Sequence, residues 1–147
     1  MNIFRSLHHV CIVVRDIDKA VAYYDSVGIG PWHPYPPLQQ FTELTGYDRD
    51  VFLAMKYKYA NIDNVQIQLC QPGSGDSEQR RFLDSHGEGV FHLGFVVPDC
   101  DAGEAAGKDL GLKVLMSGRR PDRTGFTYFD TAGPAGVVLE IRASPKA

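Results

Sequence analysis

Four polar side chains of this sequence could together hold a metal ion: His9, Gln68, His92 and Glu140. Each stands inside a short apolar run of the kind that forms a buried strand. Two imidazoles, one carboxylate and one amide oxygen suit a divalent ion such as Co²⁺, Zn²⁺, Ni²⁺, Mn²⁺ or Fe²⁺. Burying Glu140 without a partner would be costly, and coordination of a cation would remove that cost. The residue types therefore predict a divalent metal site.

The two histidines belong to an internal duplication. His92 follows His9 by 83 positions, and the same spacing relates several residues of the flanking segments. These further matches are Val14 with Val97, Asp16 with Asp99, Asp18 with Asp101, and Gly28 with Gly111. A single histidine in an apolar strand is more often a hydrogen-bonded core residue. A fixed offset across a strand, a helix cap and a helix stop indicates a repeat and favours the ligand interpretation.

Each half of the duplication begins with a strand and a helix. Asp16 is the expected N-cap of the first helix, because its carboxylate can accept backbone N–H groups, and Asp99 stands at the matching place in the second half. The polar stretch at residues 41–50 is expected to be a mobile loop over a cleft. Strands are predicted at residues 7–14, 51–59, 64–69, 90–97, 112–116, 125–130 and 137–142.

These elements predict an α+β fold in which two pseudo-symmetric βαβββ modules form an incomplete barrel around a metal-lined cleft. The whole chain, residues 1–147, is expected to be one domain. Module 1 covers about residues 5–72, a linker covers residues 73–88, and module 2 covers about residues 89–143.

Composition restricts the class of protein. The chain has 147 residues, of which 44% are hydrophobic and 22% charged, as in ordinary globular proteins. A net charge of −3 argues against nucleic-acid binding. No apolar run is long enough to span a membrane and no signal peptide is recognisable, so a cytoplasmic location is expected. Cys11, Cys70 and Cys100 lack metal-site spacing and are interpreted as reduced thiols.

At the level of motifs the sequence resembles the vicinal oxygen chelate superfamily. This superfamily includes glyoxalase I, methylmalonyl-CoA epimerase, extradiol dioxygenases and bleomycin- or fosfomycin-resistance proteins. The segments that carry the resemblance are His8-His9-Val10 with Asp16, Gln68-Leu69-Cys70-Gln71-Pro72, Gly89-Val90-Phe91-His92 and Gly136-Val137-Val138-Leu139-Glu140. The resemblance extends from His9 to Glu140 and is closest to methylmalonyl-CoA epimerases and their relatives. It places the family's metal positions on His9, Gln68, His92 and Glu140.

The resemblance implies a metal-dependent isomerase or epimerase that removes a proton next to a carbonyl of a small molecule, such as an acyl-CoA. Glu140 is the expected base. Bacterial epimerases of this type carry a second catalytic glutamate on the third strand, whereas residues 50–56 of this chain contain none. Glu43 is the nearest carboxylate and the candidate second base. Unpaired edge strands, together with the resemblance, predict a homodimer.

Three alternatives share the fold. The first is a glyoxalase I-like lyase. An Fe²⁺ dioxygenase would use His9, His92 and Glu140 as a two-histidine, one-carboxylate triad. A non-catalytic drug-binding protein of the bleomycin-resistance type has no need of all four metal-type residues. A basic group could contact a phosphate- or carboxylate-bearing substrate, but a solvated basic face is the favoured interpretation. Its members are Lys56, Lys58, Arg119, Arg120 and Arg123.

Overall fold

The computed structural model describes residues 1–145 and divides the chain into two compact units. The His9 unit comprises His9–Leu38 and Arg49–Phe91. The His92 unit comprises Met1–His8, Gln39–Asp48 and the chain from His92 onward. The short segment 39–48 therefore belongs with the second half of the sequence, although it is encoded within the first.

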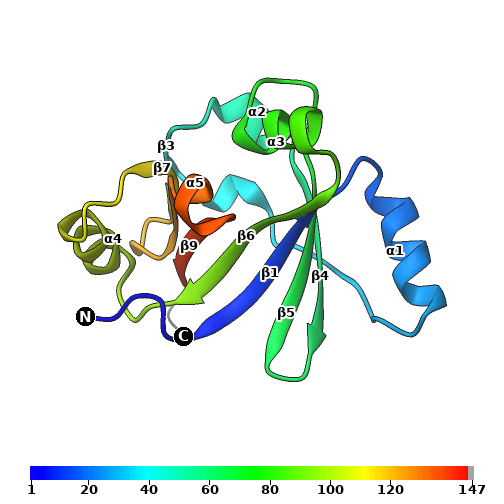
Figure 1. Ribbon diagram of the computed structural model, residues 1–147, viewed down its shortest axis with the longest axis horizontal. Helices are drawn as coiled ribbons and strands as arrows, with labels where there is room; N and C mark the ends of the chain where they lie inside the picture. The colour runs from blue at the N-terminus through cyan, green and yellow to red at the C-terminus, as the bar shows by residue number, and fades with distance from the viewer. Residues whose placement is uncertain (146–147) are drawn as a thin grey trace. The chain divides into compact units, whose positions relative to one another are not determined.

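The His9 unit contains a four-stranded sheet with a helix alongside it (Figure 1). Its elements are β1 (Leu7–Val13), α1 (Ile17–Ser26), β2 (His33–Pro34), α2 (Arg49–Leu53), β4 (Lys56–Ile62), β5 (Val65–Gln71) and α3 (Glu78–His86). The strand order is β2-β4-β5-β1. β4 and β5 are antiparallel, β1 and β5 are parallel, and His9 is the register partner of Gln66.

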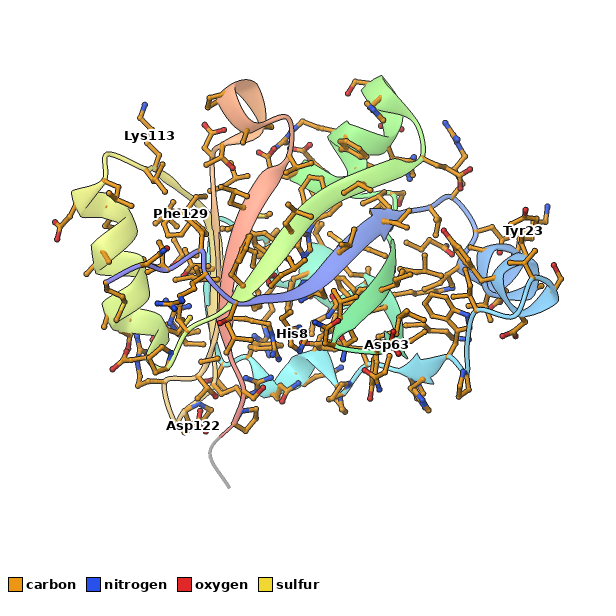
Figure 2. The ribbon with its side chains drawn as sticks, turned by 60° about the horizontal axis from the view of Figure 1, so that its bottom comes forward. His8, Tyr23, Asp63, Lys113, Asp122 and Phe129 are labelled. Atoms are coloured by element: carbon orange, nitrogen blue, oxygen red, sulfur yellow. The ribbon has the colours of Figure 1, made fainter. Side chains whose placement is uncertain are left out.

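Local sequence explains the start of α1. The carboxylate of Asp16 accepts a hydrogen bond from the backbone N–H of Lys19 at 3.1 Å, as predicted for an N-cap. The apolar face of the helix then packs on the sheet. A core of Val14, Ile17 and Leu69 is covered by the partly buried Ala20 and Tyr24. Tyr23, on the opposite side of α1, is exposed and points away from the sheet (Figure 2).

The His92 unit contains a five-stranded sheet in the order β6-β9-β8-β7-β3. Its elements are β3 (Glu43–Thr45), β6 (Gly89–Val96), α4 (Cys100–Asp109), β7 (Val114–Arg119), β8 (Gly125–Phe129), α5 (Ala132–Ala135) and β9 (Val138–Ala143). A 3₁₀ turn, η1 (Leu38–Gln40), precedes β3. β6 and β9 are parallel, and the other neighbouring strands are antiparallel.

Helix α4 packs closely on the sheet of its own unit. Asp99 caps it by accepting a hydrogen bond from the backbone N–H of Ala102 at 3.0 Å. Gly107 faces the ring of Phe129, which is fully buried in the core of the unit and is labelled beside α4 in Figure 2. Because Gly107 has no side chain, the ring of Phe129 can pack directly against the backbone of α4.

The plan strand, helix and three strands occurs twice, as β1-α1-β2-β4-β5 and as β6-α4-β7-β8-β9. In both copies the first and last strands are parallel neighbours, and an aspartate caps the helix. The sheet of each unit is open. These features confirm the predicted α+β class with two βαβββ repeats.

Two local predictions are wrong. Residues 41–50 are not one continuous loop, because residues 43–45 form β3, which pairs antiparallel with β7, with Glu43 as the register partner of Arg119. Residues 51–59 are not one strand, because α2 occupies Arg49–Leu53 and β4 begins only at Lys56. A short apolar run fits a buried helix or a buried strand equally well, and here the helix buries Phe52.

No helix within residues 1–145 combines the length and the apolar character that crossing a membrane requires.

Candidate functional site

His92 and Glu140 meet in the centre of the His92 unit. Glu140 on β9 is the register partner of Gly94 on β6, so it shares a face with His92, two residues earlier on β6. Nε2 of His92 lies 3.4 Å from Oε2 of Glu140. His92 is 1% exposed and Glu140 is 4% exposed. The two strands that the duplication singled out therefore bring an imidazole and a carboxylate together inside the protein.

The surroundings of Glu140 make it an unusual carboxyl group. Burial raises its pKa above the ordinary value, and the nearby His92 and Arg142 partly oppose that rise. A hydrogen bond from Tyr128 acts in the same direction as His92. A buried carboxyl whose pKa is raised is a stronger base than an exposed one once it is ionised, and it gains more from a cation. Glu140 is therefore suited to bind a metal ion or to accept a proton.

His9 and Gln68 lie on the parallel strands β1 and β5 of the His9 unit. His9 is the register partner of Gln66, and Gln66 and Gln68 lie on one face of β5. His9 and Gln68 therefore point to the same side of the sheet. His9 is 2% exposed and Gln68 is 5% exposed. Both polar side chains are thus buried, as expected for ligands rather than for solvent-facing residues.

A chain of amides orients Gln68. Its Nε2 donates to Oε1 of Gln66 at 3.0 Å, and Nε2 of Gln66 donates to Oδ1 of Asn61 at 3.2 Å. The amide nitrogen of Gln68 is therefore directed to its neighbour. The amide oxygen is then the atom that can serve as a ligand to a cation.

The donor set fits a divalent metal ion. In the His92 unit a buried imidazole nitrogen and a buried carboxylate suit the transition metals, and the His9 unit has a buried imidazole nitrogen and an amide oxygen of the same suitability. The 3.4 Å between Nε2 of His92 and Oε2 of Glu140 supports this fit, because two ligand atoms each about 2 Å from one ion lie about 3–3.5 Å apart.

Glu43 lies at the surface of the His92 unit. Its carboxylate accepts a hydrogen bond from Nη1 of Arg123 at 2.7 Å, and its side chain is 61% exposed. Arg123 also donates to Asp101 from Nε and Nη2. The structure therefore places the candidate second base in an ion pair on β3.

The predicted basic face is wrong for two of its five members. Arg119 is 3% exposed and Arg120 is 9% exposed. Arg119 donates to Asp101 and Glu104 on α4 and to Thr127 on β8. Arg120 donates to Gln40 and lies over the ring of Phe41. Buried guanidinium groups with these partners connect elements of one unit and are not a solvated surface.

Sequence reasoning missed Tyr128. This residue on β8 is the antiparallel register partner of Glu140 and forms a hydrogen bond with its carboxylate. The sequence places an aromatic residue in a strand near the final strand, but α5 separates the two strands, so no turn motif sets their register. Only the observed register identifies the partner of Tyr128.

Comparison with known proteins identifies the class. The sequence model of the Glyoxalase/Bleomycin resistance protein/Dioxygenase superfamily matches residues 8–129. This match covers most of the chain, which therefore belongs to that superfamily, and the predicted resemblance is confirmed. A search of curated protein sequences gives no match.

Solved structures of similar fold include methylmalonyl-CoA epimerases. The enzyme from Mycobacterium tuberculosis is 23% identical, with a TM-score of 0.73, and the match covers 98% of this chain and 91% of the other. A variant of the Streptomyces coelicolor epimerase in complex with 2-nitronate-propionyl-CoA is 24% identical, with a TM-score of 0.75 and coverage of 97% and 99%. A hypothetical protein from Bacillus halodurans is 18% identical, with a TM-score of 0.73 and coverage of 97% and 96%. At these identities the likeness shows a shared fold.

Proposed function

We propose that this protein is a metal-dependent isomerase of the epimerase type, which removes a proton from a carbon next to a carbonyl group. The observation that carries the proposal is the buried pair of His92 and Glu140, 3.4 Å apart on adjacent parallel strands. A base of this kind must be shielded from water and close to a group that stabilises its charge. Glu140 meets both conditions.

We further propose that His9, Gln68, His92 and Glu140 together hold one divalent ion. Two equivalent βαβββ repeats each supply one histidine from the first strand and one oxygen donor from the last. When bound, the ion would stabilise the negative charge that develops on the carbonyl oxygen of the substrate.

Glu140 moves the proton in this proposal. Its carboxylate takes the proton from the carbon next to the carbonyl and then carries it as a carboxylic acid. Inversion requires delivery of a proton to the opposite face of that carbon. Glu43 is the proposed second group, and it would exchange its ion pair with Arg123 for a contact with substrate.

The proposed substrate is a small acyl thioester, such as an acyl-CoA. Support comes from solved epimerases of the same fold, one of which is in complex with methylmalonyl-CoA. The acyl group itself is left open in this proposal, since these epimerases are 23–24% identical to this chain.

The metal site is tested by titrating Co²⁺ into purified apoprotein and into the variants His9→Ala and His92→Ala. One ion per chain is expected, and either variant alone should lose most of the binding. His86→Ala is the matched control, because His86 is exposed on α3 and stacks on Phe82. Full binding that survives His9→Ala would contradict a shared site.

The reaction is tested by incubating 2-substituted acyl thioesters with the metal-loaded protein in D₂O. Metal-dependent appearance of deuterium at the carbon next to the carbonyl is the expected result. Glu43→Gln should keep this exchange and lose inversion of a chiral substrate. Metal-dependent oxygen uptake without exchange would instead favour a dioxygenase.

A homodimer stays a prediction. One outermost strand of each unit, β2 in the His9 unit and β3 in the His92 unit, is only 2 or 3 residues long and offers little edge for pairing. Sedimentation at micromolar concentration distinguishes a dimer from a monomer.

A further inference from the structure

Tyr128 contacts both candidate ligands of the His92 unit. Across the antiparallel pair of β8 and β9 it stands directly opposite Glu140, and its hydroxyl donates a hydrogen bond to the Glu140 carboxylate. The rings of Tyr128 and His92 make an edge-to-face contact, with their centroids 4.8 Å apart and their planes at 79°. One side chain thus contacts the imidazole through its ring and the carboxylate through its hydroxyl.

Packing holds Tyr128 in this position. The residue is 4% exposed, and its ring lies 5.3 Å from that of Phe126 on the same strand. Phe126 in turn packs on Phe41 at 5.1 Å. A tyrosine in such a row has little rotational freedom, and its buried hydroxyl must find a partner. Glu140 provides that partner.

We propose that Tyr128 is a positioning residue that fixes Glu140 and His92 for the metal ion. The proposal rests on the proposed function, because it assumes that these two side chains are ligands. A carboxylate held by a hydrogen bond and an imidazole held by a ring lose few rotamers when a cation binds. Loss of such an outer partner typically weakens metal affinity by about 10–100-fold.

The proposal distinguishes Tyr128 from a residue that merely fills the core. Phenylalanine at this position would keep the ring, the contact with His92 and the packing on Phe126. It would remove only the hydroxyl that orients Glu140. The variant Tyr128→Phe therefore isolates the effect of one hydrogen bond on the geometry of the candidate ligands.

The experiment compares Co²⁺ binding by the unaltered protein, Tyr128→Phe and Tyr24→Phe. Tyr24 is the matched control, because it is a half-buried tyrosine that packs on Trp32 in the His9 unit. Affinity is measured by titration at a temperature at which calorimetry shows each apoprotein folded. The visible absorption spectrum of bound Co²⁺ is recorded at saturation, since it reports ligand geometry independently of fold stability.

Tyr128→Phe should bind Co²⁺ about 10–100-fold more weakly and give a changed spectrum at saturation, whereas Tyr24→Phe should match the unaltered protein. Unchanged affinity and an unchanged spectrum in Tyr128→Phe would overturn the role of Tyr128 while leaving the metal site intact. Absence of Co²⁺ binding by the unaltered protein would instead overturn the proposed function, and this inference with it.

Discussion

The two repeats carry their candidate ligands at equivalent positions but differ in the charge and the hydrogen-bond partners of those ligands. In the His92 unit the imidazole lies 3.4 Å from a carboxylate, which is held across the strands by Tyr128. In the His9 unit the last strand supplies the neutral amide of Gln68, which is held along its own strand by Gln66. One repeat thus carries the negative charge and the candidate base, while the other carries neutral donors. The two repeats therefore keep equivalent ligand positions but differ in the charge of the residues at those positions.

The helices show a second difference. Gly103 and Gly107 of α4 correspond to Ala20 and Tyr24 of α1 when the offset of 83 positions is applied. The glycines face Ile141 and Phe129, so α4 approaches its sheet without intervening side chains. In α1 the equivalent positions carry side chains that cover the core of the His9 unit. The close packing of α4 stabilises the strands that carry Tyr128 and Glu140.

The largest expected effect comes from removing the charge that distinguishes the repeats. Glu140→Gln keeps an oxygen donor but removes the base, so metal-dependent deuterium exchange should fall by about 10²–10⁴-fold or more. Bound metal is measured in parallel, to separate loss of the base from loss of the ion. Glu88→Gln, which makes the same change at an exposed carboxylate paired with Arg15, is the matched control. Undiminished exchange in Glu140→Gln would move the base to Glu43.

The second prediction concerns the close approach of α4. In Gly107→Ala the added Cβ would lie 2.6 Å from Cε1 of Phe129, whose ring is fully buried. Overpacking should lower the free energy of unfolding by about 1–3 kcal/mol, measured by urea denaturation. Gly133→Ala is the control, because nothing lies within 4 Å of its Cβ position. Equal stability of the two variants would show that the core around Phe129 has room for a Cβ at Gly107.

A smaller effect is expected from the partner that orients the neutral ligand. Gln66→Leu removes the acceptor that holds Nε2 of Gln68. A hydrogen bond of this kind is worth about 0.5–1.5 kcal/mol, so Co²⁺ affinity should fall by about 2–10-fold. Gln39→Leu, at an exposed glutamine, should leave affinity unchanged. A loss larger than that in Tyr128→Phe would reverse the ranking of the two halves.

The smallest effect concerns pH and the ion pairs of Asp101 in the His92 unit. The corresponding Asp18 of the His9 unit is 85% exposed and has a longer ion pair, at 3.7 Å from Lys58. Hydrogen bonds from Arg123, followed by Arg119, hold the pKa of Asp101 below its usual value of 3.8. A carboxyl with a lowered pKa stabilises the fold above its unfolded pKa and loses that contribution as pH falls through the folded value.

Asp101→Asn should therefore lower the free energy of unfolding at neutral pH, by about 1 kcal/mol or less because the side chain of Asp101 is 44% exposed. The difference from the unaltered protein should shrink as the pH falls below about 4. Thermal melts at a series of pH values measure it, with Asp18→Asn as the control. A difference that stays constant across this range would contradict the ionic origin of the effect.

Local signals predicted the repeated elements well. Asp16 and Asp99 cap their helices through hydrogen bonds to N–H groups three residues ahead, an interaction that the neighbouring sequence is sufficient to specify. The apolar runs around His92 and Glu140 predicted strands because both faces of these strands are largely covered. The offset between the repeats then identified His92, which the structure brings into contact with Glu140.

Short elements were predicted poorly because their conformation depends on distant partners. Residues 43–45 form a strand only because β7 lies beside them, and Gly46 adopts φ +77° where a Cβ would meet the backbone of Leu115. α2 contains only five residues, too few for helix propensity to decide its state. Tertiary contacts therefore decided both segments.

The sequence by itself determined the two βαβββ repeats, their helix caps and the identity of four buried polar side chains. Only the tertiary structure decided which neighbours those side chains have. Tyr128 lies opposite Glu140 because of a strand register that no turn motif in the sequence predicts. Arg119 is buried because carboxylates from α4 accept its hydrogen bonds. Hydrogen bonds across strands and between helix and sheet depend on the packed geometry, whereas caps and periodicity depend on residues a few positions apart.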